Sequence, residues 1–465
     1  MGLSSSSSNA KGTKGIPPGP WNPMTILNIP TSPAENLTEM SHYYGPVFSF
    51  RMPGSPLTVV LNNYTVIREA LIDNAEAFPT RVTSPLRHSW GIKGRIFYSL
   101  GEDQKVIRKF VLDGLKDFQE GILFVKVSEE ARHLCEAFDK EKGKGIETTN
   151  LLTLASGNIM SILNFGQRYD YNDERILKLM ESFDYLHLAL KPGNPVQQYP
   201  WLYDTFLYRQ LKESQEYVKK FIKEEIKSHR ATLDPANPRD FIDLYLMRIK
   251  GNDPDDLFNY ERAWYTIKDV FSSSSNPSAA GLQWMIALVC RHQDMQEKIY
   301  QEVQAVIGNE RLPAFSDLQK MPFTHAFMME VLRFRTVVPF GTREVIRDVV
   351  IDGYLIPKGS RIYLNYWANE RDPAIWNNPS EFNPERFLTP EKKNVVKNKY
   401  NIPLGMGHRD CMGQTLANME MFLFGTNLIQ KFRLTFSPDE PEPPLRGICG
   451  TVVVCEKFKL CASRR

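Results

Sequence analysis

A single cysteine in a glycine-rich loop has surroundings that point to metal chemistry. Cys411 lies in the run PLGMGHRDCMG (403–413), with Gly407 and Gly413 on either side and Arg409 two residues before it. Glycines let the backbone approach a large flat ligand and aim amide groups at the sulfur. The start of the apolar helical pattern that follows favours the thiolate, which is the form that binds iron. We therefore expect Cys411 to bind a metal and Arg409 to meet a carboxylate, although a lone cysteine is more often a small buried hydrophobe.

Two further motifs lie upstream of this loop. Glu330 and Arg333 stand three residues apart in the helical run EVLR, and the segment FNPERF, which contains Arg386, ends 24 residues before Cys411. A Glu and an Arg at this spacing are usually no more than a surface ion pair. The three motifs together, in this order and at this spacing, are highly specific.

With these motifs the chain resembles the cytochrome P-450 superfamily of heme-thiolate proteins over nearly its whole length, from Pro17 to about Cys461. The superfamily pattern around the heme ligand is F-x-x-G-x-R-x-C-x-G, and here Leu404 replaces the phenylalanine. The resemblance implies heme b (iron protoporphyrin IX) as the cofactor and Cys411 as its axial metal ligand. It also implies further cofactor-binding positions at Gly407, Arg409 and Gly413, and a buried structural network of Glu330, Arg333 and Arg386.

The resemblance implies a fold that is mainly α-helical, with a large helical domain and a small β-rich lobe. We expect residues 17–465 to form a single domain, with the lobe built from about residues 40–75 and 335–370. Within it, the run PVFSFRMPGSPLTVVL (46–61) predicts two strands around a Pro-Gly turn. Residues 447–454 predict a terminal hairpin whose turn reaches the ligand cavity.

The resemblance also implies which residues surround the heme. Arg108 matches the arginine of a W-x-x-x-R motif that contacts a heme propionate, although Gln104 replaces the tryptophan, and Arg343 stands where the family places a His or Arg on a propionate. Residues 80–100 are expected to overlie the heme, although plain core packing explains their apolar side chains equally well. The expected pocket residues are Phe97, Phe271, Ser275, Pro277, Val338 and Phe340.

The most informative departure from the family lies in the long helix expected over about residues 261–292, across the distal heme face. The consensus [AG]-G-x-[DE]-T-[TS] falls on residues 273–278, so that Asn276 replaces the acid and Pro277 replaces the threonine. In oxygen-activating members these two residues relay protons to the distal oxygen, so that the O–O bond breaks heterolytically. An amide cannot relay protons as a carboxylate can, a proline has no hydroxyl, and Ser278 is displaced by roughly 100° around the helix.

Without this relay, a heme-thiolate can still cleave an O–O bond that the substrate brings. An asparagine at the corresponding position is found in the hydroperoxide-metabolising branch (allene oxide synthases, hydroperoxide lyases, epoxyalcohol synthases), although its flanking residues differ from those here. We therefore expect an enzyme that rearranges fatty-acid hydroperoxides without O2, NADPH or a reductase, with Asn276 and Cys411 as catalytic residues. Epoxyalcohol formation is favoured over the allene oxide and lyase branches. A helix-kink role, in which Asn276 satisfies the carbonyl freed by Pro277, is the alternative.

Two rival functions stay open. A membrane-bound, NADPH-dependent monooxygenase of lipids, steroids or xenobiotics fits the general layout, because the PPGP hinge, GYLIPKG and FNPERF resemble animal drug- and steroid-oxidising members. Lys105, Arg108 and Lys109 would then supply a surface for the reductase. A non-catalytic heme-binding protein is the second rival. Reactivity alone separates the three.

The composition of the chain indicates which class of partner it binds and in which cellular compartment it lies. The formal net charge of +3 over 465 residues is too near balance to argue for nucleic acid, so the expected partner is a small lipid substrate. The six cysteines form no C-x-x-C pair, which favours a reducing, intracellular compartment. Residues 1–16 are expected to be a flexible leader. If it replaces an anchor helix the protein belongs on the endoplasmic reticulum membrane, and otherwise in the cytoplasm. Peripheral membrane contact is expected near residues 190–203.

Overall fold

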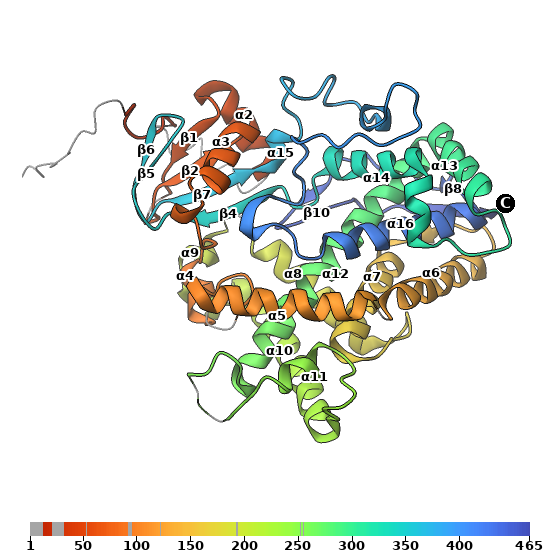
Figure 1. Cartoon of the computed structure of the whole chain (residues 1–465), viewed down its shortest axis with the longest axis horizontal. Coiled ribbons are helices and arrows are strands. Elements are labelled where there is room, and N and C mark those ends of the chain that lie inside the picture. The colour runs from red at the N-terminus through yellow and green to blue at the C-terminus, as the bar shows by residue number, and fades with distance from the viewer. Residues whose placement is uncertain are drawn as a thin grey trace, which may run out of the picture.

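The computed structural model of the chain describes residues 13–20, 32–52, 54–91, 95–120, 122–191, 194–251, 253 and 255–465. Of the expected leader, residues 1–12 lie outside this described part. Helices dominate the described residues and the strands are short, so the expected mainly α-helical class is confirmed (Figure 1).

The helices follow the chain in a fixed order. The α-helices are α2 Pro33–Tyr44, α3 Tyr64–Arg68, α4 Pro85–Ser89, α5 Gly101–Glu120, α6 Leu123–Lys140, α7 Thr149–Phe165, α8 Glu174–Ala189, α9 Pro195–Gln198, α10 Arg209–Thr232, α11 Phe241–Leu246, α12 Tyr260–Arg291, α13 Gln293–Val306, α14 Pro322–Arg335, α15 Tyr366–Asn369 and α16 Gln414–Lys431. Shorter helical turns are η1 Glu69–Asp73, η2 Ala75–Ala77, η3 Pro200–Asp204, η4 Phe206–Tyr208, η5 Phe315–Lys320, η6 Pro384–Phe387 and η7 Gly407–Arg409.

The strands belong to small sheets. They are β1 Val47–Phe50, β2 Thr58–Leu61, β3 Ile146–Glu147, β4 Phe340–Glu344, β5 Val349–Ile351, β6 Tyr354–Ile356, β7 Arg361–Asn365, β8 Phe432–Phe436, β9 Ile448–Cys449, β10 Val453–Val454 and β11 Lys459–Arg464. The largest sheet has the order β1-β2-β7-β4, and it joins the start of the chain to residues 340–365. The two strands and the turn expected over residues 46–61, and the terminal hairpin over 447–454, are therefore present.

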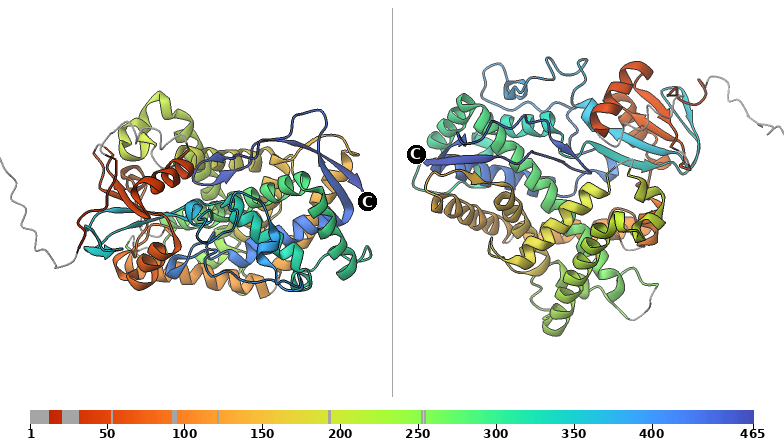
Figure 2. Two further views of the ribbon diagram at one scale, coloured as in Figure 1. Left: turned by 90° about the horizontal axis from the view of Figure 1, so that it is seen from above. Right: turned by 180° about the vertical axis from the view of Figure 1, so that it is seen from behind.

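The β-rich lobe lies at one end of the molecule. Strands β1 and β2 are antiparallel, β2 runs parallel to β7, and β4 pairs with β7 antiparallel. All residues of β1 and β2 are buried, because helices α2 and α3 pack beside the sheet (Figure 1). The views from above and from behind place this lobe at one end and the C-terminus at the other (Figure 2).

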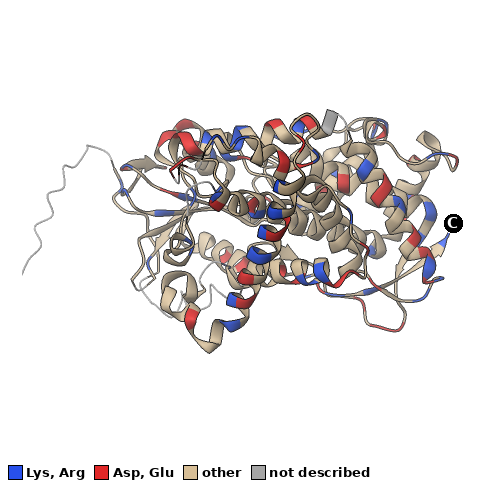
Figure 3. Ribbon diagram, turned by 90° about the horizontal axis from the view of Figure 1, so that it is seen from below, with Lys and Arg blue, Asp and Glu red and all other residues tan. Residues whose placement is uncertain are grey.

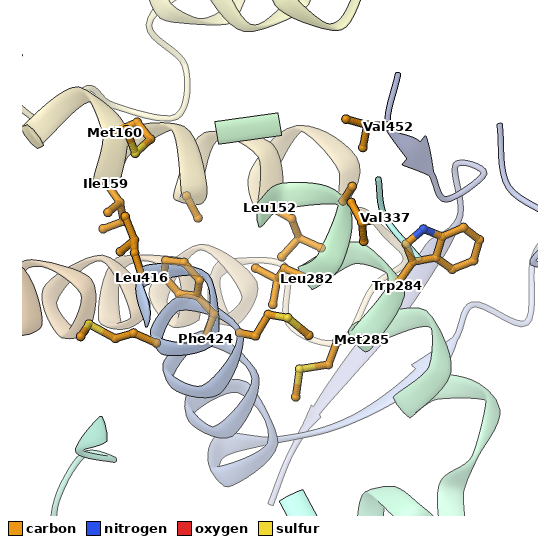
Figure 4. Packing of buried hydrophobic residues seen from close by; sticks show 14 of the residues in the cluster. Leu152, Ile159, Met160, Leu282, Trp284, Met285, Val337, Leu416, Phe424 and Val452 are labelled. Atoms are coloured by element: carbon orange, nitrogen blue, oxygen red, sulfur yellow. The ribbon is translucent and has the colours of Figure 1, made fainter. Parts of the chain in front are cut away.

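Helix α12 is the centre of the helical part. It begins at Tyr260, after the N-cap residue Asn259, whose side chain accepts a hydrogen bond from the Arg262 backbone N–H at 2.9 Å. It continues through Pro277 without a break. Leu282 and Met285 pack toward Phe424 of α16 (Figure 4). Apolar side chains of α12, α7 and α16 thus form one core, and burying each large side chain contributes about 1.5–3 kcal/mol.

A buried ion-pair network braces α14 against the segment that precedes the cysteine loop. Arg333 contacts Glu330 at 2.7 Å, and both side chains are fully buried. Arg386 approaches the same carboxylate at 3.2 Å. Arg333 also donates to the carbonyl oxygens of Glu370 and Pro379, at 2.7 and 3.0 Å. The structural network expected from the sequence is therefore assembled in space.

Removing one partner of this network leaves a buried charge without compensation. We expect Glu330→Ala to lower the free energy of unfolding by about 3–5 kcal/mol, measured by chemical denaturation. The control is Lys109→Ala, which removes an exposed partner of Asp113 at 2.8 Å and should cost about 0–1 kcal/mol. Equal losses in the two variants would contradict a bracing role for Glu330.

Candidate heme and substrate site

Two glycines hold the cysteine loop close to the β-rich lobe. Gly405 and Gly407 have φ values of +80° and +77°, a conformation that other residues rarely adopt. A Cβ atom on Gly407 would lie 3.0 Å from the carbonyl oxygen of Leu71. The Cys411 backbone N–H donates to the carbonyl oxygen of Leu404 at 3.1 Å. The loop is thus fixed before α16 begins.

Cys411 opens onto a cavity of about 650 Å³. The side chain is exposed to that space, and a Cβ atom on Gly413 would meet no atom within 4 Å. Burial within the protein raises the pKa of the Cys411 thiol, whereas the Gly413 backbone N–H and the nearby Arg81 act in the opposite direction. A cation bound at the sulfur would stabilise the thiolate further.

Four of the expected pocket residues line this cavity. They are Phe97, Pro277, Val338 and Phe340. The turn between β9 and β10 also reaches it through Gly450, Thr451 and Val452. The cavity is therefore enclosed by segments from both ends of the chain.

Three expected residues of α12 lie elsewhere. Phe271 is fully buried and stacks between Phe165 and Phe183, with ring centroids at 5.3 and 5.4 Å. Ser275 is also fully buried, and its hydroxyl donates to the Phe271 carbonyl oxygen at 2.9 Å. The amide nitrogen of Asn276 donates to the carboxylate of Asp184 on α8. The expected direct role of Asn276 beside a bound peroxide does not fit this geometry.

The periodicity of the helix explains this placement. From Val270 onward, the residues of α12 that line the cavity are Val270, Ser272, Ser273, Ser274, Pro277, Ser278 and Gly281. Apart from Ser272, they recur at intervals of three and four. Each residue turns the helix by about 100°, so Asn276 faces α8 while Pro277 faces the cavity. The side chain of Asn276 also does not reach back to the carbonyl that Pro277 leaves free.

A cluster of guanidinium groups surrounds the cavity beside the cysteine. Arg81, Arg343 and Arg409 line it, and no carboxylate among the described residues lies within ion-pair distance of them. Arg409 donates instead to the carbonyl oxygens of Pro79 and Ser99, at 3.0 and 3.2 Å. The buried Nε atom of Arg343 has no hydrogen-bond partner. Such a cluster calls for an anionic ligand.

Burial and the closeness of these positive charges lower the pKa values of the arginines. Burial and the neighbouring Arg81 and Arg343 lower the pKa of Arg409 to about 9. Burial lowers the pKa of Arg343 to about 10. Arg108 differs, because its guanidinium donates to the Asp410 carboxylate at 2.5 Å, which neutralises part of its charge. Arg343 and Arg409 are therefore left beside the cavity without a counter-ion among the described residues, whereas Arg108 is already paired with Asp410.

Sequence reasoning missed Arg81. It lies in the loop before α4, where no motif marks it, and its guanidinium stacks on the Phe97 ring at 4.7 Å. Burial lowers its pKa, and Cys411 is among its charged neighbours. Only the packing of this loop against the cysteine loop brings Arg81 into the site.

A buried carboxyl group lies behind the cavity face of α12 and was also missed. Glu420 on α16 is 1 % exposed. Burial raises its pKa to about 8, although the hydroxyls of Ser156 and Ser278 act in the opposite direction. Neither carboxyl oxygen makes a close hydrogen bond. Glu420 therefore holds its proton at neutral pH, next to a serine that lines the cavity.

Comparison with known proteins agrees with the site. Residues 16–462 match the family model described as Cytochrome P450. The chain is 34% identical to human cytochrome P450 2U1 over 440 residues, which is 92% of this chain and 80% of that protein. It is 33% identical to rabbit (Oryctolagus cuniculus) cytochrome P450 2C16 over 96% of this chain and 93% of that protein, and 32% identical to rabbit 2B4 over 92% and 89%. The chain belongs to the cytochrome P450 family.

The residues of the cavity fit the cofactor of this family, heme b, which is bound through a cysteine thiolate. Cys411 is positioned to hold the iron. The open side of Gly413 leaves space for a flat ring. The unpaired guanidinium groups of Arg81, Arg343 and Arg409 match the two propionates that such a ring carries. The expected heme cofactor is thus supported by both the family and the cavity.

Arg409 is the member of the cluster whose removal tests this assignment. A hydrogen bond to a charged group contributes about 1.5–3 kcal/mol, so we expect Arg409→Gln to lose heme roughly 10–100-fold faster than the unmodified protein. Transfer of heme to excess apomyoglobin measures this rate.

The matched control for Arg409 is Arg361→Gln. Arg361 also lines the cavity, but it donates to Gln198 at 3.4 Å, outside the cluster. Its heme dissociation rate should stay within about twofold of the unmodified protein, which corresponds to less than 1 kcal/mol. If Arg409→Gln released heme no faster than Arg361→Gln, the propionate assignment would be refuted.

Proposed function

We propose that this protein is an NADPH-dependent monooxygenase that oxidises an apolar or amphipathic lipid. The observation that carries the proposal is the buried Glu420 carboxyl beside Ser278, because reductive oxygen activation consumes protons and this pair supplies them at the cavity. Two observations agree with it. The cavity next to Cys411 is largely lined by apolar side chains, and the relatives that match most of the chain carry the names of cytochromes P450 2U1, 2C16 and 2B4.

Heme held by Cys411 would supply oxygen activation, and the chain would supply position and protons. Pro277 cannot donate a proton, and Asn276 faces Asp184. Glu420 would instead pass its proton to the hydroxyl of Ser278, which lines the cavity, once a hydrogen bond joins the two side chains. A general acid with a pKa near the working pH is well suited to such transfer. This arrangement replaces the acid and the threonine that the family pattern has on α12.

A reductase surface would differ from the one expected from sequence. On α5, Lys105 pairs with Glu102 at 3.0 Å and Lys109 pairs with Asp113 at 2.8 Å, while Arg108 turns to Asp410 in the cavity. Basic and acidic residues are interspersed along the helices seen from below (Figure 3). A reductase that docks on α5 would therefore meet both basic and acidic side chains and not a purely basic surface.

Hydroperoxide rearrangement is the second candidate function, and Pro277 is the observation that favours it. This proline lines the cavity where the family pattern has a hydroxyl. Cleavage of a peroxide bond that the substrate brings requires no proton relay. Ser273 and Ser274 line the same face of α12, so their hydroxyls, rather than the amide of Asn276, would bind the peroxide.

One pair of assays separates these functions. The ferric protein is mixed with a linoleic-acid hydroperoxide without NADPH, and loss of the conjugated-diene absorbance is followed. In parallel, linoleic acid is supplied with NADPH and a cytochrome P450 reductase, and hydroxylated products are measured. We expect turnover in the second assay. Turnover in the first assay alone would replace the proposal by the isomerase function, and none in either would leave a non-catalytic heme protein.

Glu420→Gln tests the proton supply. We expect product formation with NADPH to fall by about 10²-fold or more, because general acid catalysis typically contributes 10²–10⁴-fold. In the unmodified protein the rate should fall above pH 8, since the pKa of Glu420 is about 8 and its proton is lost there. The pH–rate profile of the variant should lack this descending limb.

Two serines provide the matched comparison for Glu420. Both interact with its carboxyl group, but only Ser278 lines the cavity. Ser278→Ala should reproduce the loss, and Ser156→Ala should retain most of the rate. Equal effects of the two serine substitutions would show that Glu420 acts on packing and not on protons.

Peripheral membrane contact belongs to the same proposal. No helix of the described part of the chain is both long and apolar enough to span a bilayer. Trp201, Phe206 and Leu207 in η3 and η4 are, however, 67, 86 and 64 % exposed. Large apolar side chains gathered on one surface mark a site of interaction. We propose that η3 and η4 touch the surface of a lipid bilayer.

Substitution of this surface tests the contact. Phe206→Ser combined with Leu207→Ser should weaken binding to phosphatidylcholine vesicles by roughly tenfold or more, because burying each side chain contributes about 1.5–3 kcal/mol. Co-sedimentation measures it. Leu312→Ser, at an exposed leucine outside η3 and η4, is the control and should bind as the unmodified protein does. Unchanged binding of the double variant would exclude this surface.

A further inference from the structure

The cavity carries more positive charge than heme propionates can balance. Among the described residues that line it, eight are basic and two are acidic. The basic residues are Arg81, Arg87, Arg95, Arg108, Lys268, Arg343, Arg361 and Arg409, and the acidic ones are Asp269 and Asp410. The two carboxylates and two propionates leave four basic side chains without an acidic counterpart. Buried charges are costly unless they are paired. These basic side chains therefore indicate that the cavity binds a further anion.

Six of these basic residues fall into two groups. Arg81, Arg343 and Arg409 lie beside the cysteine and lower one another's basicity. Lys268 and Arg95 form the other group, since Arg95 is the charged neighbour that most lowers the pKa of Lys268. Arg87 belongs to the second group as well, because it acts on both Lys268 and His187.

Helix geometry separates the second group from the reacting end of the cavity. Lys268 and Pro277 are nine residues apart on α12, which corresponds to about 14 Å at 1.5 Å per residue. Helices α4 and α8 contribute Arg87 and His187 to the Lys268 end. The group therefore lies well along the cavity from the α12 turn that contains Pro277.

Lys268 lacks a negative partner. Its side chain is 6 % exposed, and its ammonium donates to the neutral amide oxygen of Gln215 at 3.1 Å. The adjacent carboxylate of Asp269 is taken by Arg95, whose Nη2 and Nε donate to its two oxygens at 2.8 and 3.3 Å. No ion pair of Lys268 occurs within the described ranges. The ammonium also lies near the rings of Trp90 and Trp264, at 5.6 and 5.9 Å from their centroids, so its surroundings supply no anionic partner.

Arg87 is equally free of a carboxylate. It donates to the carbonyl oxygen of Leu190 at 3.4 Å, and its guanidinium stacks on the Tyr98 ring at 5.4 Å. His187 does not add charge, because burial and the nearby Arg87 and Lys268 lower its pKa to about 4. Its Nδ1 atom bonds the Thr451 hydroxyl at 2.7 Å. The ligand therefore meets two unpaired cations, Lys268 and Arg87.

Apolar side chains connect these cations to the heme site. Phe183, Leu186 and Leu190 line the cavity near His187, and Val270 lines it two residues along α12 from Lys268. Phe97 and Val338 line it further on. A ligand that satisfies both the charge and the walls has an anionic head and a long hydrocarbon chain.

We propose that Lys268 and Arg87 bind the carboxylate of a long-chain fatty acid, and that its hydrocarbon chain extends along α12 toward Cys411. This inference rests on the proposed function for the oxidation itself, and it names the substrate class. The carboxylate is held far from the iron, so the enzyme oxidises the chain at a carbon distant from the acid group. Asp269 and Arg95 remain paired and position Lys268.

Binding is measured without turnover. Dodecanoic acid and its methyl ester are titrated into the ferric holoprotein, and binding is followed by equilibrium dialysis and by the change in the heme absorption spectrum. We expect the acid to bind at least tenfold more tightly than the ester, because a hydrogen bond to a charged group contributes about 1.5–3 kcal/mol. Equal affinity for acid and ester would overturn the proposal.

The variants assign the effect to Lys268. Lys268→Gln should weaken binding of the acid by roughly tenfold and change the affinity for the ester by no more than about twofold. Lys268→Arg should restore the affinity for the acid. The matched control is Lys219→Gln, since Lys219 also lies over the Trp264 ring, at 5.9 Å, but does not line the cavity. A Lys268→Gln variant that loses acid and ester affinity equally would indicate damage to packing and refute the site.

The pH dependence gives an independent readout. Burial and Arg95 lower the pKa of Lys268 to about 7, so its charge is lost as the pH rises from 7 to 9. Affinity for the acid should fall over this range and affinity for the ester should not. The groups that face Lys268 are Arg87, Arg95, Asp269, His187 and Gln215. His187, whose pKa is lowered to about 4, stays neutral over this range. An affinity for the acid that does not change over this pH range would contradict the role of Lys268 in binding the carboxylate.

These results are separable from the proposed function, because no binding assay uses NADPH, reductase or a peroxide. Selective binding of the acid without turnover would leave the carboxylate site standing and refute the oxidation. Turnover with equal binding of acid and ester would do the reverse.

Discussion

Positive charge enclosed in an apolar cavity is the constraint on which the rest of the structure depends. Arg343 and Arg409 are buried to 3 and 5 % exposure, and their lowered pKa values record the cost of that burial. Such groups are tolerable only where anions meet them. The cysteine loop, the loop that carries Arg81 and strand β4 converge so that one dianionic ring can satisfy them together. A bound dianionic ring thus supplies the negative charge that the chain itself lacks at this site.

Helix α12 serves two environments at once. One face, with Phe271 and Ser275, packs into the helical core, and the other, with Pro277 and Ser278, borders the cavity. A proline in a helix interior leaves the carbonyl four residues earlier without its usual donor. That position is Ser273, itself on the cavity side, where a polar ligand or water can meet the free carbonyl. The missing backbone hydrogen bond therefore lies on the cavity side of α12 and not in the packed core.

Local motifs could be predicted from the sequence, and contacts between distant segments could not. The Cys411 loop and the Glu330, Arg333 and Arg386 network were predictable because their residue types and spacing are specific. Asn276 was placed by position along the helix alone, but its direction depends on where α8 lies. Arg81 and Lys268 carry no motif, since their roles arise only when a loop and a helix far apart in sequence border the same cavity. The strands of the lobe were predictable in place, and their sheet order was not.

The turn between β9 and β10 has a consequence for how the protein is made. Gly450, Thr451 and Val452 close one wall of the cavity, and the Thr451 backbone N–H donates to the His187 carbonyl oxygen at 3.2 Å. Val453 accepts a hydrogen bond from the Trp284 indole at 2.9 Å. A chain emerging from the ribosome N-terminus first can form most helices early, but its pocket has no final wall until some 450 residues have been synthesised. Enclosure of the cofactor is therefore one of the last events of biosynthesis.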